Sequence, residues 1–454
     1  MIVSNIRFHF PASLLEVHSR IVKAGFQCYA VGGAVRNIVL HQKPKDWDLA
    51  TDATPRDIMR LFRTVLPTGI KHGTVTILYK GEKFETTTFR VEGIYSDSRH
   101  PDRVDYTNDL WEDLKRRDFT INAMAVNPQE RKLIDPYGGR EDCKKRIIRA
   151  LGDPAERFSE DALRILRAVR FSAQLNFTIE PATLSAMKTL ASTLLRVSAE
   201  RIRDEMEKIM ASERPSQGFS CMADTGILSI LFPELEACRR IGDNLDVFTH
   251  SILTCDAAPP TEPVIRWAAL LHDIGKPSTV SVGPDGSIRF HGHEQVSACL
   301  ASAILRRLRF PLAFERRVHH LILHHMFHYE ENWTDAAVRR FVRTVGKENV
   351  EDLFSLRYAD GWGARGEKPD PGPLTAFRKR IARVLAENSP LSLTELSVNG
   401  NDLAEKAGIP RGPAMGKVLE FLLESVLEDP ALNTPDTLLT LARNFYQTRL
   451  DVSG

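Results

Sequence analysis

The sequence predicts an α/β head followed by helical domains. Residues 1–142 alternate strand-like runs at 75–79, 84–89 and 123–126 with helical stretches such as 55–62, which begins at Thr54-Pro55. From residue 143 onward apolar residues recur at helical spacing almost throughout, most clearly at 161–171 and 200–208. A chain of 454 residues exceeds a single ordinary core, so we expect roughly three or four domains.

Composition argues against secreted and membrane proteins. The six cysteines are scattered without CxxC pairing, which indicates thiols of a reducing compartment and not a disulfide frame or a zinc ribbon. The N-terminus lacks the apolar run and cleavage site of a signal peptide, and no uncharged apolar stretch reaches about 18 residues. We therefore expect a soluble, cytoplasmic protein with no membrane partner.

Overall charge does not predict a nucleic-acid partner, because the net charge is only +2. Local clustering is more informative. Basic residues gather just after the head, at Lys144, Lys145, Arg146, Arg149, Arg164, Arg167, Arg170, Arg196, Arg201 and Arg203. Ordinary solvated helix faces are the alternative interpretation of these residues.

The first candidate site is the glycine pair of the segment Tyr-Ala-Val-Gly-Gly-Ala-Val-Arg at 29–36. Residues 28–31 predict a short buried strand, and Gly32 and Gly33 open a helix that extends to about His41. The backbone N–H groups of this turn can cradle phosphate at a helix N-terminus. A glycine pair alone fits an ordinary strand–turn–helix equally well.

Two carboxylates follow the glycine pair, in Asp46-Trp47-Asp48. Alternate residues of a strand share a face about 6.5–7 Å apart, so Asp46 and Asp48 can share one cluster of divalent metal while Trp47 faces the other way. Acidic surface strands are common, and the pair alone is weak evidence. The glycine turn and the carboxylate pair in this order favour a site for metal-assisted nucleotidyl transfer.

The two motifs together resemble a known family. Gly32-Gly33-Ala-Val-Arg36 followed by Asp46-Trp-Asp48-Leu-Ala-Thr resembles the catalytic head of the class II tRNA nucleotidyltransferases, the family of bacterial CCA-adding enzymes and poly(A) polymerases. Further segments resemble its successive signatures in the family's order, at 68–76, 84–90, 116–123, 135–139, 157–164 and 199–203. The resemblance covers about residues 30–210 and implies a head of the DNA polymerase β-type nucleotidyltransferase fold, followed by all-α neck, HD and tail domains. The chain departs from the family at Asn37, where an acidic residue is usual.

The resemblance implies template-independent addition of CCA to the 3′ end of tRNA from CTP and ATP. In that reaction the 3′-hydroxyl of the RNA attacks the α-phosphate, and two Mg²⁺ ions stabilise the developing charge. Asp46 and Asp48 would hold these ions. Glu85, on a later predicted strand, is the candidate third catalytic carboxylate, and a strand-face glutamate paired with Arg90 or a lysine is the alternative.

The remaining nucleotide contacts divide into two sets. Those expected at the triphosphate are Gly32, Gly33 and Arg36. Those that the resemblance implies for the sugar and phosphates are Arg117, Asp118 and Asn122. Asp118 would accept a hydrogen bond from a ribose hydroxyl and so reject deoxynucleotides.

Asp161 and Arg164 are the candidate base-selecting pair, and Arg167 completes the nucleotide-binding set. The pair lies three residues apart on a predicted helix, hence on one face. Cytosine and adenine both present an exocyclic amine beside a bare ring nitrogen, so a carboxylate accepts from the amine and a guanidinium donates to the nitrogen. Uracil and guanine reverse this pattern and leave buried groups unpaired. Without the flanking motif, a surface salt bridge is the better interpretation.

The segment 95–101, Tyr-Ser-Asp-Ser-Arg-His-Pro, bears on which nucleotides the enzyme adds. It resembles the flexible segment that complete CCA-adding enzymes keep and CC-only enzymes shorten, although His100 replaces the usual second arginine. The segment therefore favours full CCA addition. One alternative is an A-adding or poly(A) polymerase of the same family. Another is an HD-type metal phosphohydrolase whose head only binds RNA, which the intact Asp46-x-Asp48 argues against.

A second constellation follows the H…HD…D order of the HD phosphohydrolase superfamily. Its residues are His250, His272, Asp273 and Asp360, with His293, His324 and His325 as additional candidate ligands. Imidazole with carboxylate suits a transition metal such as nickel, manganese or zinc. An active domain implies phosphatase or 2′,3′-cyclic phosphodiesterase chemistry on damaged RNA ends, and a degenerate structural domain is the alternative.

The C-terminal segment 398–416, together with Asn433, resembles the tail of bacterial CCA-adding enzymes. Its Gly-Pro turns can present N–H groups to a tRNA backbone, although a plain helical turn is an equally good local interpretation. We expect four domains: a nucleotidyltransferase head at 1–142, a helical neck for base selection at 143–235, an HD domain at 236–370 and a helical, tRNA-binding tail at 371–454.

Overall fold

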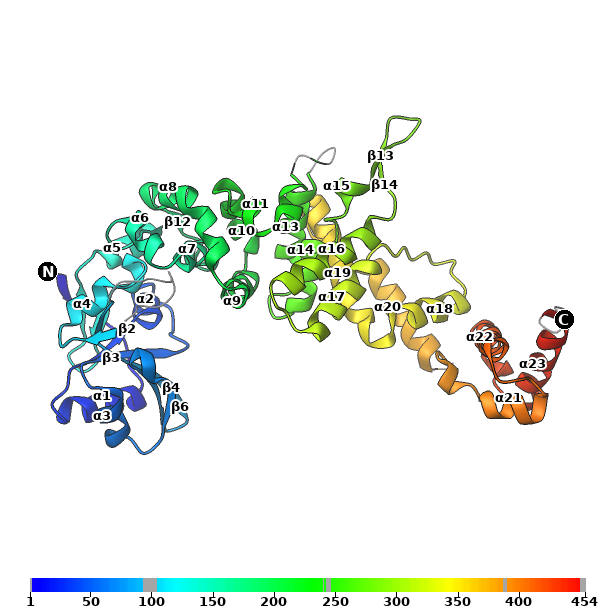
Figure 1. The fold of residues 1–454 in the computed structure, drawn as a ribbon, viewed down its shortest axis with the longest axis horizontal. Helices are drawn as coiled ribbons and strands as arrows, with labels where there is room; N and C mark the ends of the chain where they lie inside the picture. Colours follow the sequence, from blue (N-terminus) through cyan, green and yellow to red (C-terminus); the bar gives the residue numbers. More distant parts are fainter. Residues whose placement is uncertain (1, 93–103, 240, 242–245, 387–389, 450–454) are drawn as a thin grey trace. The chain divides into compact units, whose positions relative to one another are not determined.

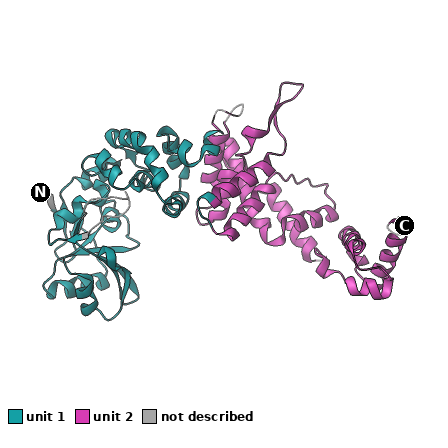
Figure 2. Ribbon diagram, viewed as in Figure 1, with its two compact units in different colours: residues 1–237, 307–310 teal, residues 238–306, 311–454 magenta. Residues whose placement is uncertain are grey.

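The computed structural model divides into two compact units (Figure 2). The first comprises residues 1–237 and 307–310, and the second comprises residues 238–306 and 311–454. The structure describes all residues except 1, 93–103, 240, 242–245, 387–389 and 450–454 (Figure 1). The segment 95–101, on which the choice of product was argued, lies outside the described residues.

The head is built on an eight-stranded mixed sheet in the order β1-β10-β9-β2-β3-β6-β5-β4. These strands span Ile2–Asn5, Lys132–Asp135, Ala125–Asn127, Cys28–Val31, Trp47–Thr51, Glu82–Thr88, Thr74–Tyr79 and Val65–Gly69, respectively. Neighbouring strands are antiparallel except β3 and β6, which run parallel with Asp48 opposite Glu85. The predicted α/β head is confirmed, and its one parallel pair sets two candidate carboxylates beside each other.

Local sequence signals account for most elements of the head. The predicted strands at 28–31, 75–79 and 84–89 correspond to β2, β5 and β6. The predicted helix at 55–62 is α3 (Pro55–Leu61), which a capping box between Thr54 and Asp57 starts. The strand predicted at 123–126 is wrong in its first half, because Thr120–Asn122 form a short 3-10 turn and β9 begins only at Ala125.

Helices and short strands complete the first unit (Figure 1). In the head these are α1 (Ala12–Lys23), α2 (Gly33–Val39), α4 (Leu110–Lys115) and α5 (Gly139–Lys145). Beyond the head follow α6 (Pro154–Glu160), α7 (Leu163–Leu175), α8 (Pro181–Leu190), α9 (Ala199–Met210), α10 (Pro215–Asp224), α11 (Ile227–Leu231) and α12 (Pro233–Glu236). Two small sheets pair β7 (Arg90–Glu92) with β8 (Val104–Tyr106), and β11 (Ile147–Ile148) with β12 (Thr178–Ile179).

The second unit is largely helical. Its helices are α13 (Val247–Ala257), α14 (Pro263–Leu271), α15 (Lys276–Thr279), α16 (His293–Arg307), α17 (Leu312–Leu323), α18 (Asp335–Val345), α19 (Val350–Arg365), α20 (Gly372–Ala386), α21 (Gly400–Ala407), α22 (Pro413–Glu428) and α23 (Pro435–Arg449). Its one described hairpin pairs β13 (Val280–Val282) with β14 (Ile288–Phe290). The predicted change from an α/β head to helical domains is therefore confirmed.

Gly361 and Gly363 lie inside helix α19, and the chain leaves the helix only at 366–371, before α20 begins. Helix α19 continues to Arg365, and a Cβ atom on Gly363 would lie 2.1 Å from Oγ1 of Thr254 and 2.7 Å from its backbone nitrogen. The glycine thus lets α19 pack directly against α13. This contact lies three residues from Asp360 and four from His250, so it also sets the distance between two candidate metal ligands.

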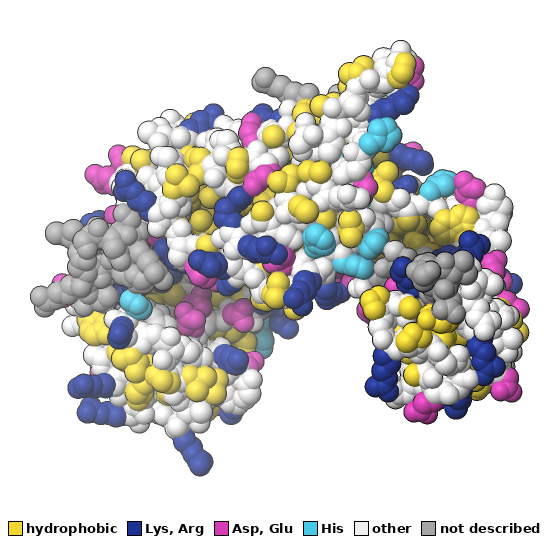
Figure 3. All heavy atoms as spheres, turned by 45° about the vertical axis from the view of Figure 1, so that its right-hand side comes forward, with side chains coloured by type: hydrophobic (Ala, Val, Ile, Leu, Met, Phe, Trp, Pro, Cys, Tyr) yellow, Lys and Arg dark blue, Asp and Glu magenta, His cyan; other side chains and the backbone are white. Residues whose placement is uncertain are grey.

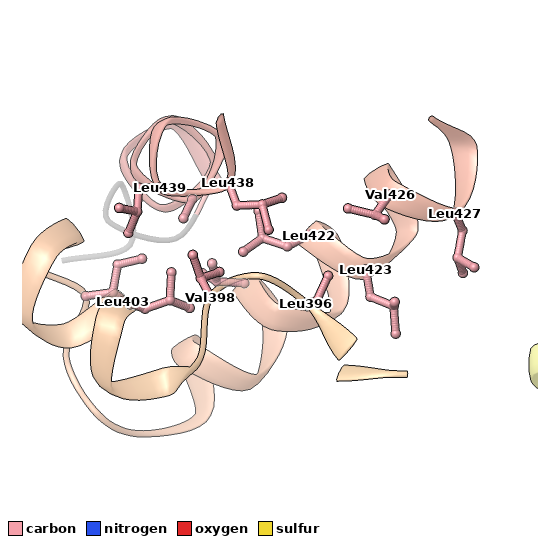
Figure 4. Close-up of a cluster of buried hydrophobic side chains, with 12 residues drawn as sticks. Leu396, Val398, Leu403, Leu422, Leu423, Val426, Leu427, Leu438 and Leu439 are labelled. Carbon is pink, nitrogen blue, oxygen red and sulfur yellow. The ribbon is translucent and has the colours of Figure 1, made fainter. Parts of the chain in front are cut away.

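The C-terminal helices α21, α22 and α23 enclose a small apolar core of their own (Figure 4). Leu403, Leu422 and Leu438 come from the three helices in turn, and all three are fully buried. Such a core allows the tail to hold its shape through its own apolar contacts.

Basic and acidic side chains intermingle over the visible face of the molecule (Figure 3). This agrees with the near-balance of 61 basic and 59 acidic residues. Among the residues that the structure describes, no helix is both long enough and apolar enough to cross a lipid bilayer.

Candidate functional site

Asp48 and Glu85 face one cavity of about 620 Å³ in the first unit. Burial, Glu85 and Asp46 together raise the pKa of Asp48 to about 6, although Arg117 opposes the rise. Asp46 is exposed and lies one residue before β3. Asp48 and Glu85 are therefore brought together, whereas Asp46 is not among the residues that line the cavity, and burial is the largest cause of the raised pKa of Asp48.

The turn between β2 and α2 forms another wall of this cavity. Gly32 adopts a φ of 67° and a ψ of −136°, a backbone conformation that residues other than glycine rarely adopt. A Cβ atom at this position would lie 3.3 Å from Oδ2 of Asp48 and 3.4 Å from Nη1 of Arg117. Gly32 therefore lets the backbone approach the carboxylate and the guanidinium closely, as the glycine motif predicted.

Arg36 extends from α2 into the same cavity. Its Nη1 donates to Oδ1 of Asn122 at 2.9 Å, and its Nη2 donates to Oδ1 of Asn37 at 3.1 Å. The unusual Asn37 thus keeps a hydrogen bond to the arginine and brings no negative charge.

Asp118 is buried among groups that stabilise its charge. It accepts hydrogen bonds from Nε of Arg167 at 2.7 Å, Nδ2 of Asn122 at 3.1 Å and the N–H of Phe119 at 2.8 Å. Burial alone would raise the pKa of Asp118, but Arg167 and these hydrogen bonds lower it to about 2. The structure therefore joins three predicted contacts, Asp118, Asn122 and Arg167, in one network.

Sequence reasoning missed Asp113, which holds two arginines of this wall. Its carboxylate is fully buried and accepts from Arg116 at 2.7 Å and Arg117 at 3.2 Å. Arg116 and Arg117 follow it at the i+3 and i+4 positions, a spacing that favours ion pairs. That spacing was a signal available in the sequence.

The expectation that Asp161 and Arg164 share one helix is wrong. Asp161 lies between α6 and α7 with an extended backbone, because its Oδ1 accepts the N–H of Leu163 at 3.1 Å where α7 begins. Its Oδ2 pairs with Arg201 at 2.8 Å, whereas Arg164 pairs with Glu160. Asp161 and Arg164 still line the same cavity, but each is held by a different partner.

Helix α9 supports the base-selecting residues from a second element. Arg201 pairs with Asp161, and Glu205, one turn further, pairs with Arg170 of α7 at 3.2 Å. Arg170 and Glu205 are both buried. The sequence placed 199–203 among the family signatures without assigning these contacts, because pairing between helices leaves no spacing signal.

The second unit gathers the HD residues in one centre. Nε2 of His250 lies 3.1 Å from Nε2 of His272 and 3.2 Å from Oδ1 of Asp360. Nε2 of His272 lies 3.2 Å from Oδ2 of Asp273. The four predicted ligands His250, His272, Asp273 and Asp360 therefore meet, and they line a cavity of about 270 Å³.

Two of the additional histidines join this centre on the other oxygen of Asp273. Nε2 of His293 and Nε2 of His325 lie 3.2 and 3.8 Å from Oδ1 of Asp273. His324 does not join them, and its ring instead contacts His320. Two sets, His250-His272-Asp273 and Asp273-His293-His325, each bring their ligand atoms within 4.8 Å of one another.

The rings of this centre are oriented by backbone carbonyls. Nδ1 of His272, His293 and His325 lies 2.8, 2.8 and 2.7 Å from the carbonyl oxygen three residues earlier in the chain. A proton on Nδ1 leaves the lone pair on Nε2, as in metal-bound histidines. Nε2 of His293 is buried beside Oδ1 of Asp273.

The charged groups of this centre shift one another's pKa values strongly. Burial alone would lower the pKa of His272, but Asp273 and Asp360 raise it to about 10. Burial and the neighbouring His272 lower the pKa of His325 to about 3. Nζ of Lys276, three residues after Asp273, lies 2.6 Å from Oδ2 of that carboxylate.

Three family models match the chain. A poly(A) polymerase head domain matches residues 28–149, and a probable RNA- and SrmB-binding site of polymerase A matches residues 176–239. An HD domain matches residues 235–365. The HD match contains the His/Asp centre, and the head match contains the part of the nucleotide cavity that the head contributes, whereas its residues at 161–174 lie between the first two matches.

Relatives match over nearly the whole chain. The CCA-adding enzyme of Limosilactobacillus fermentum is 36% identical over 93% of this chain and 94% of its own length. That of Lactobacillus johnsonii is 42% identical over 94% of this chain and 96% of its own length.

Among solved structures, the Bacillus stearothermophilus CCA-adding enzyme in complex with CTP matches with a TM-score of 0.74. It has 29% identity and covers 96% of this chain and 98% of that chain. The Thermotoga maritima CCA-adding enzyme complexed with tRNA shares the fold, with a TM-score of 0.60 and 21% identity over 98% of this chain and 100% of that chain. The chain therefore belongs to the class II CCA-adding enzymes, which are tRNA nucleotidyltransferases.

Proposed function

We propose that the cavity of the first unit adds CCA to the 3′ end of tRNA from CTP and ATP. The observation that carries this proposal is the register of β3 and β6. It sets Asp48 beside Glu85 where the Gly32 turn and a group of arginines converge. Carboxylates at one end of a cavity and guanidinium groups along its walls suit a nucleoside triphosphate with bound metal.

Magnesium fits this donor set. Asp46, Asp48 and Glu85 offer only oxygen atoms, which Mg²⁺ prefers, and a cation would stabilise the charge of Asp48, whose pKa is raised by burial and then by Glu85 and Asp46. Bound Mg²⁺ supplies charge stabilisation at the phosphoryl group during transfer. Asp46, Asp48 and Glu85 would hold these ions beside the sheet.

The remaining residues bind the nucleotide. The N–H groups of the Gly32-Gly33 turn and the guanidinium of Arg36 hold the triphosphate. Arg117 and Asn122 contact the sugar and phosphates, and Asp118 accepts from a ribose hydroxyl. Because the low pKa of Asp118 keeps it ionised well below neutral pH, its carboxylate can accept a hydrogen bond at any pH near neutrality.

Base selection rests on Asp161 and Arg164. The carboxylate of Asp161 accepts from the exocyclic amine, and Arg164 donates to the ring nitrogen that cytosine and adenine share. Arg201 and Glu160 hold these two side chains. Separate supports fix the acceptor and the donor independently, and Arg167 lines the cavity beside them.

Substitution of the metal-binding carboxylates tests this proposal. In Asp46→Ala and Asp48→Ala proteins, incorporation of labelled CTP into tRNA should fall by about 10³-fold or more, because charge in the transition state loses its stabilisation. Asp57→Ala is the matched control, since Asp57 only caps α3 outside the cavity. Normal incorporation in the Asp48 variant would refute the proposed site.

A second function is favoured by the convergence of six metal-ligating side chains in the HD centre. We propose that it binds nickel, manganese or zinc and hydrolyses phosphate esters, such as 2′,3′-cyclic phosphates at damaged RNA ends. Mixed imidazole and carboxylate donors suit these metals better than magnesium. A bound transition metal supplies Lewis-acid activation, and Lys276 adds a positive charge beside the centre.

Asp273 contributes one oxygen to each of the two ligand sets, so we assign two ions to this centre. Metal analysis should find about two equivalents per chain, and His325→Ala should retain about one. Loss of hydrolysis of a 2′,3′-cyclic nucleotide in the His272→Ala, Asp273→Ala protein would support the activity. Unchanged hydrolysis would refute it. His328→Ala is the control, because His328 is exposed and outside the centre.

The proposed domains distribute the remaining roles. Base selection falls to 143–235, the phosphohydrolase to 236–370 and tRNA binding to the tail at 371–454. In the tail, Asn433 accepts from the N–H of Ser397 at 2.8 Å and so shapes the segment before α21.

Arg411→Ala and Lys417→Ala should each weaken tRNA binding at low salt and reduce its salt dependence, and unchanged binding would remove the tail from the interface. We place the enzyme in the cytoplasm with its tRNA substrate.

A further inference from the structure

The ring of Phe171 forms part of the cavity wall among three arginines. The Cζ atoms of Arg36, Arg167 and Arg170 lie 5.2, 5.7 and 4.3 Å from the centre of this ring. Phe171 is only 4% exposed, and Phe119 meets it edge to face at 5.7 Å. In the described part of the chain, no other ring has three guanidinium groups over it.

The arginines carry more charge than their acidic partners offset. Arg167 pairs with Asp118, and Arg170 pairs with Glu205. Arg36 has only the amide oxygens of Asn122 and Asn37 as hydrogen-bond partners, within the described ranges. The cluster therefore keeps an excess of positive charge at the cavity wall.

This excess is costly in the free enzyme. Burial lowers the pKa of Arg36, and burial together with the neighbouring Arg167 lowers the pKa of Arg170 to about 10. A triphosphate would relieve the repulsion, but until it binds the three side chains need another source of attraction.

We propose that Phe171 is a positioning residue that holds these arginines ready for the nucleotide. The faces of an aromatic ring carry partial negative charge and attract guanidinium groups within about 6 Å of the ring centre. A carboxylate here would also attract them, but it would occupy their N–H groups and repel the phosphates. The ring does neither, so it attracts Arg36 and Arg167 without adding a hydrogen-bond acceptor to those that they already have in Asn122, Asn37 and Asp118.

The ring also connects two elements of the first unit. Arg36 belongs to α2 of the head, whereas Arg167, Arg170 and Phe171 belong to α7. One side chain thus aligns donors from the triphosphate end and the base end of the cavity. This inference rests on the proposed nucleotide site, and it assigns Phe171 to nucleotide binding and not to the chemical step.

A fluorination series separates the attraction of the ring from its packing. Mono-, di- and trifluorophenylalanine at position 171 of the full-length chain progressively weaken the ring's negative face with little change in size. With tRNA as acceptor, KM for both CTP and ATP should rise stepwise, to about 3- to 30-fold for the trifluoro ring. The value of kcat and the thermal midpoint should stay near those of the parent protein.

Two leucine variants provide matched controls. Phe171→Leu should raise KM at least as much as the trifluoro ring. Phe219→Leu removes another buried ring, one that packs against Phe232 and has no arginine over it among the described residues, and it should lower stability without changing KM.

A KM that does not respond to fluorination would overturn the role of Phe171 while leaving the nucleotide site intact. If the Asp48→Ala protein also incorporated nucleotide normally, the site itself would be wrong. The two failures are therefore distinguishable.

Discussion

The nucleotide cavity and the HD centre use charged side chains in different ways. The cavity separates two of its carboxylates, Asp48 and Glu85 at the sheet, from arginines along the helical walls, which pair with other carboxylates. The HD centre concentrates them, with imidazoles and carboxylates within hydrogen-bonding distance of one another. Separated charges suit an extended, polyanionic substrate, and concentrated mixed donors suit a tightly held metal. One chain thus carries two sites that should respond to different metals and different mutations.

Metal exchange should give the largest contrast between the two sites. After chelation and dialysis, Mg²⁺ should restore incorporation of CTP and ATP and leave hydrolysis of a 2′,3′-cyclic nucleotide at background. Nickel, manganese or zinc should restore hydrolysis, because imidazole ligands favour these ions. Parallel assays of both activities after each addition would measure this. Recovery of both activities with Mg²⁺ alone would contradict the distinction.

Base selection offers the next largest effect, confined to the nucleotide cavity. Arg164→Ala removes the proposed donor to the ring nitrogen, so preference for CTP over UTP should fall by about 5- to 150-fold, the equivalent of about 1–3 kcal/mol. Arg201→Ala, which frees Asp161 without touching the base, should reduce it less. The measurement is kcat/KM for each nucleotide. Equal preference in the Arg164 variant and the parent would remove Arg164 from base selection.

Helix packing gives a test confined to the HD centre. Gly363→Ala forces a methyl group onto the backbone and hydroxyl of Thr254, which should lower the unfolding free energy by about 1–3 kcal/mol and reduce metal binding. Gly361→Ala is the matched control on the same helix, since its new methyl group would meet only the Pro369 side chain, at 3.4 Å. Denaturant unfolding and metal analysis would measure both effects. Equal losses in the two variants would contradict the importance of this contact.

A buried histidine outside both sites, His18, should have the smallest effect, which is on the pH dependence of stability. Burial lowers the pKa of His18, in contrast to His272, whose carboxylate neighbours raise it. Unfolded His18 binds a proton near its usual pKa of about 6.5 while the folded form resists it, so stability should be complete above that pH and fall below it. The slope from this residue is at most about 1.4 kcal/mol per pH unit.

Denaturant titrations between pH 7.5 and 5 would measure this slope in the parent and in a His18→Leu variant. The variant should lose that component of the slope even if its overall stability changes. Identical slopes in the two proteins would show that His18 does not titrate as argued.

The elements of the fold that depend on neighbouring residues could be predicted from the sequence. The buried strand at 28–31, the helix start at Thr54-Pro55 and the order of the strand-like and helical regions are set by neighbouring residues, and they were predicted. The helix start at 161 was not, because the side chain of Asp161 caps the next helix instead of joining it. Nor did the sequence show that Gly363 permits close packing of α19, because glycines that permit close helix packing resemble glycines that end helices.

For the same reason, only some residues of the two candidate sites could be predicted from the sequence. Motifs identified Asp48, Asp118, His272 and Asp273, since each lies within a run of characteristic residues. The partners Glu205 and Arg201, and the arginine-bound ring of Phe171, depend on contacts between helices. A single sequence carries no spacing signal for such contacts, so the supporting residues emerged only from the structure.

The most direct test uses a tRNA that ends at its discriminator base, incubated with CTP alone, ATP alone and both together, with the products sized. A CCA-adding cavity should add two cytidines with CTP alone and complete CCA with both nucleotides, and then stop. Addition of adenosine only, to a tRNA that already ends in CC, or a long adenosine tail would contradict CCA synthesis.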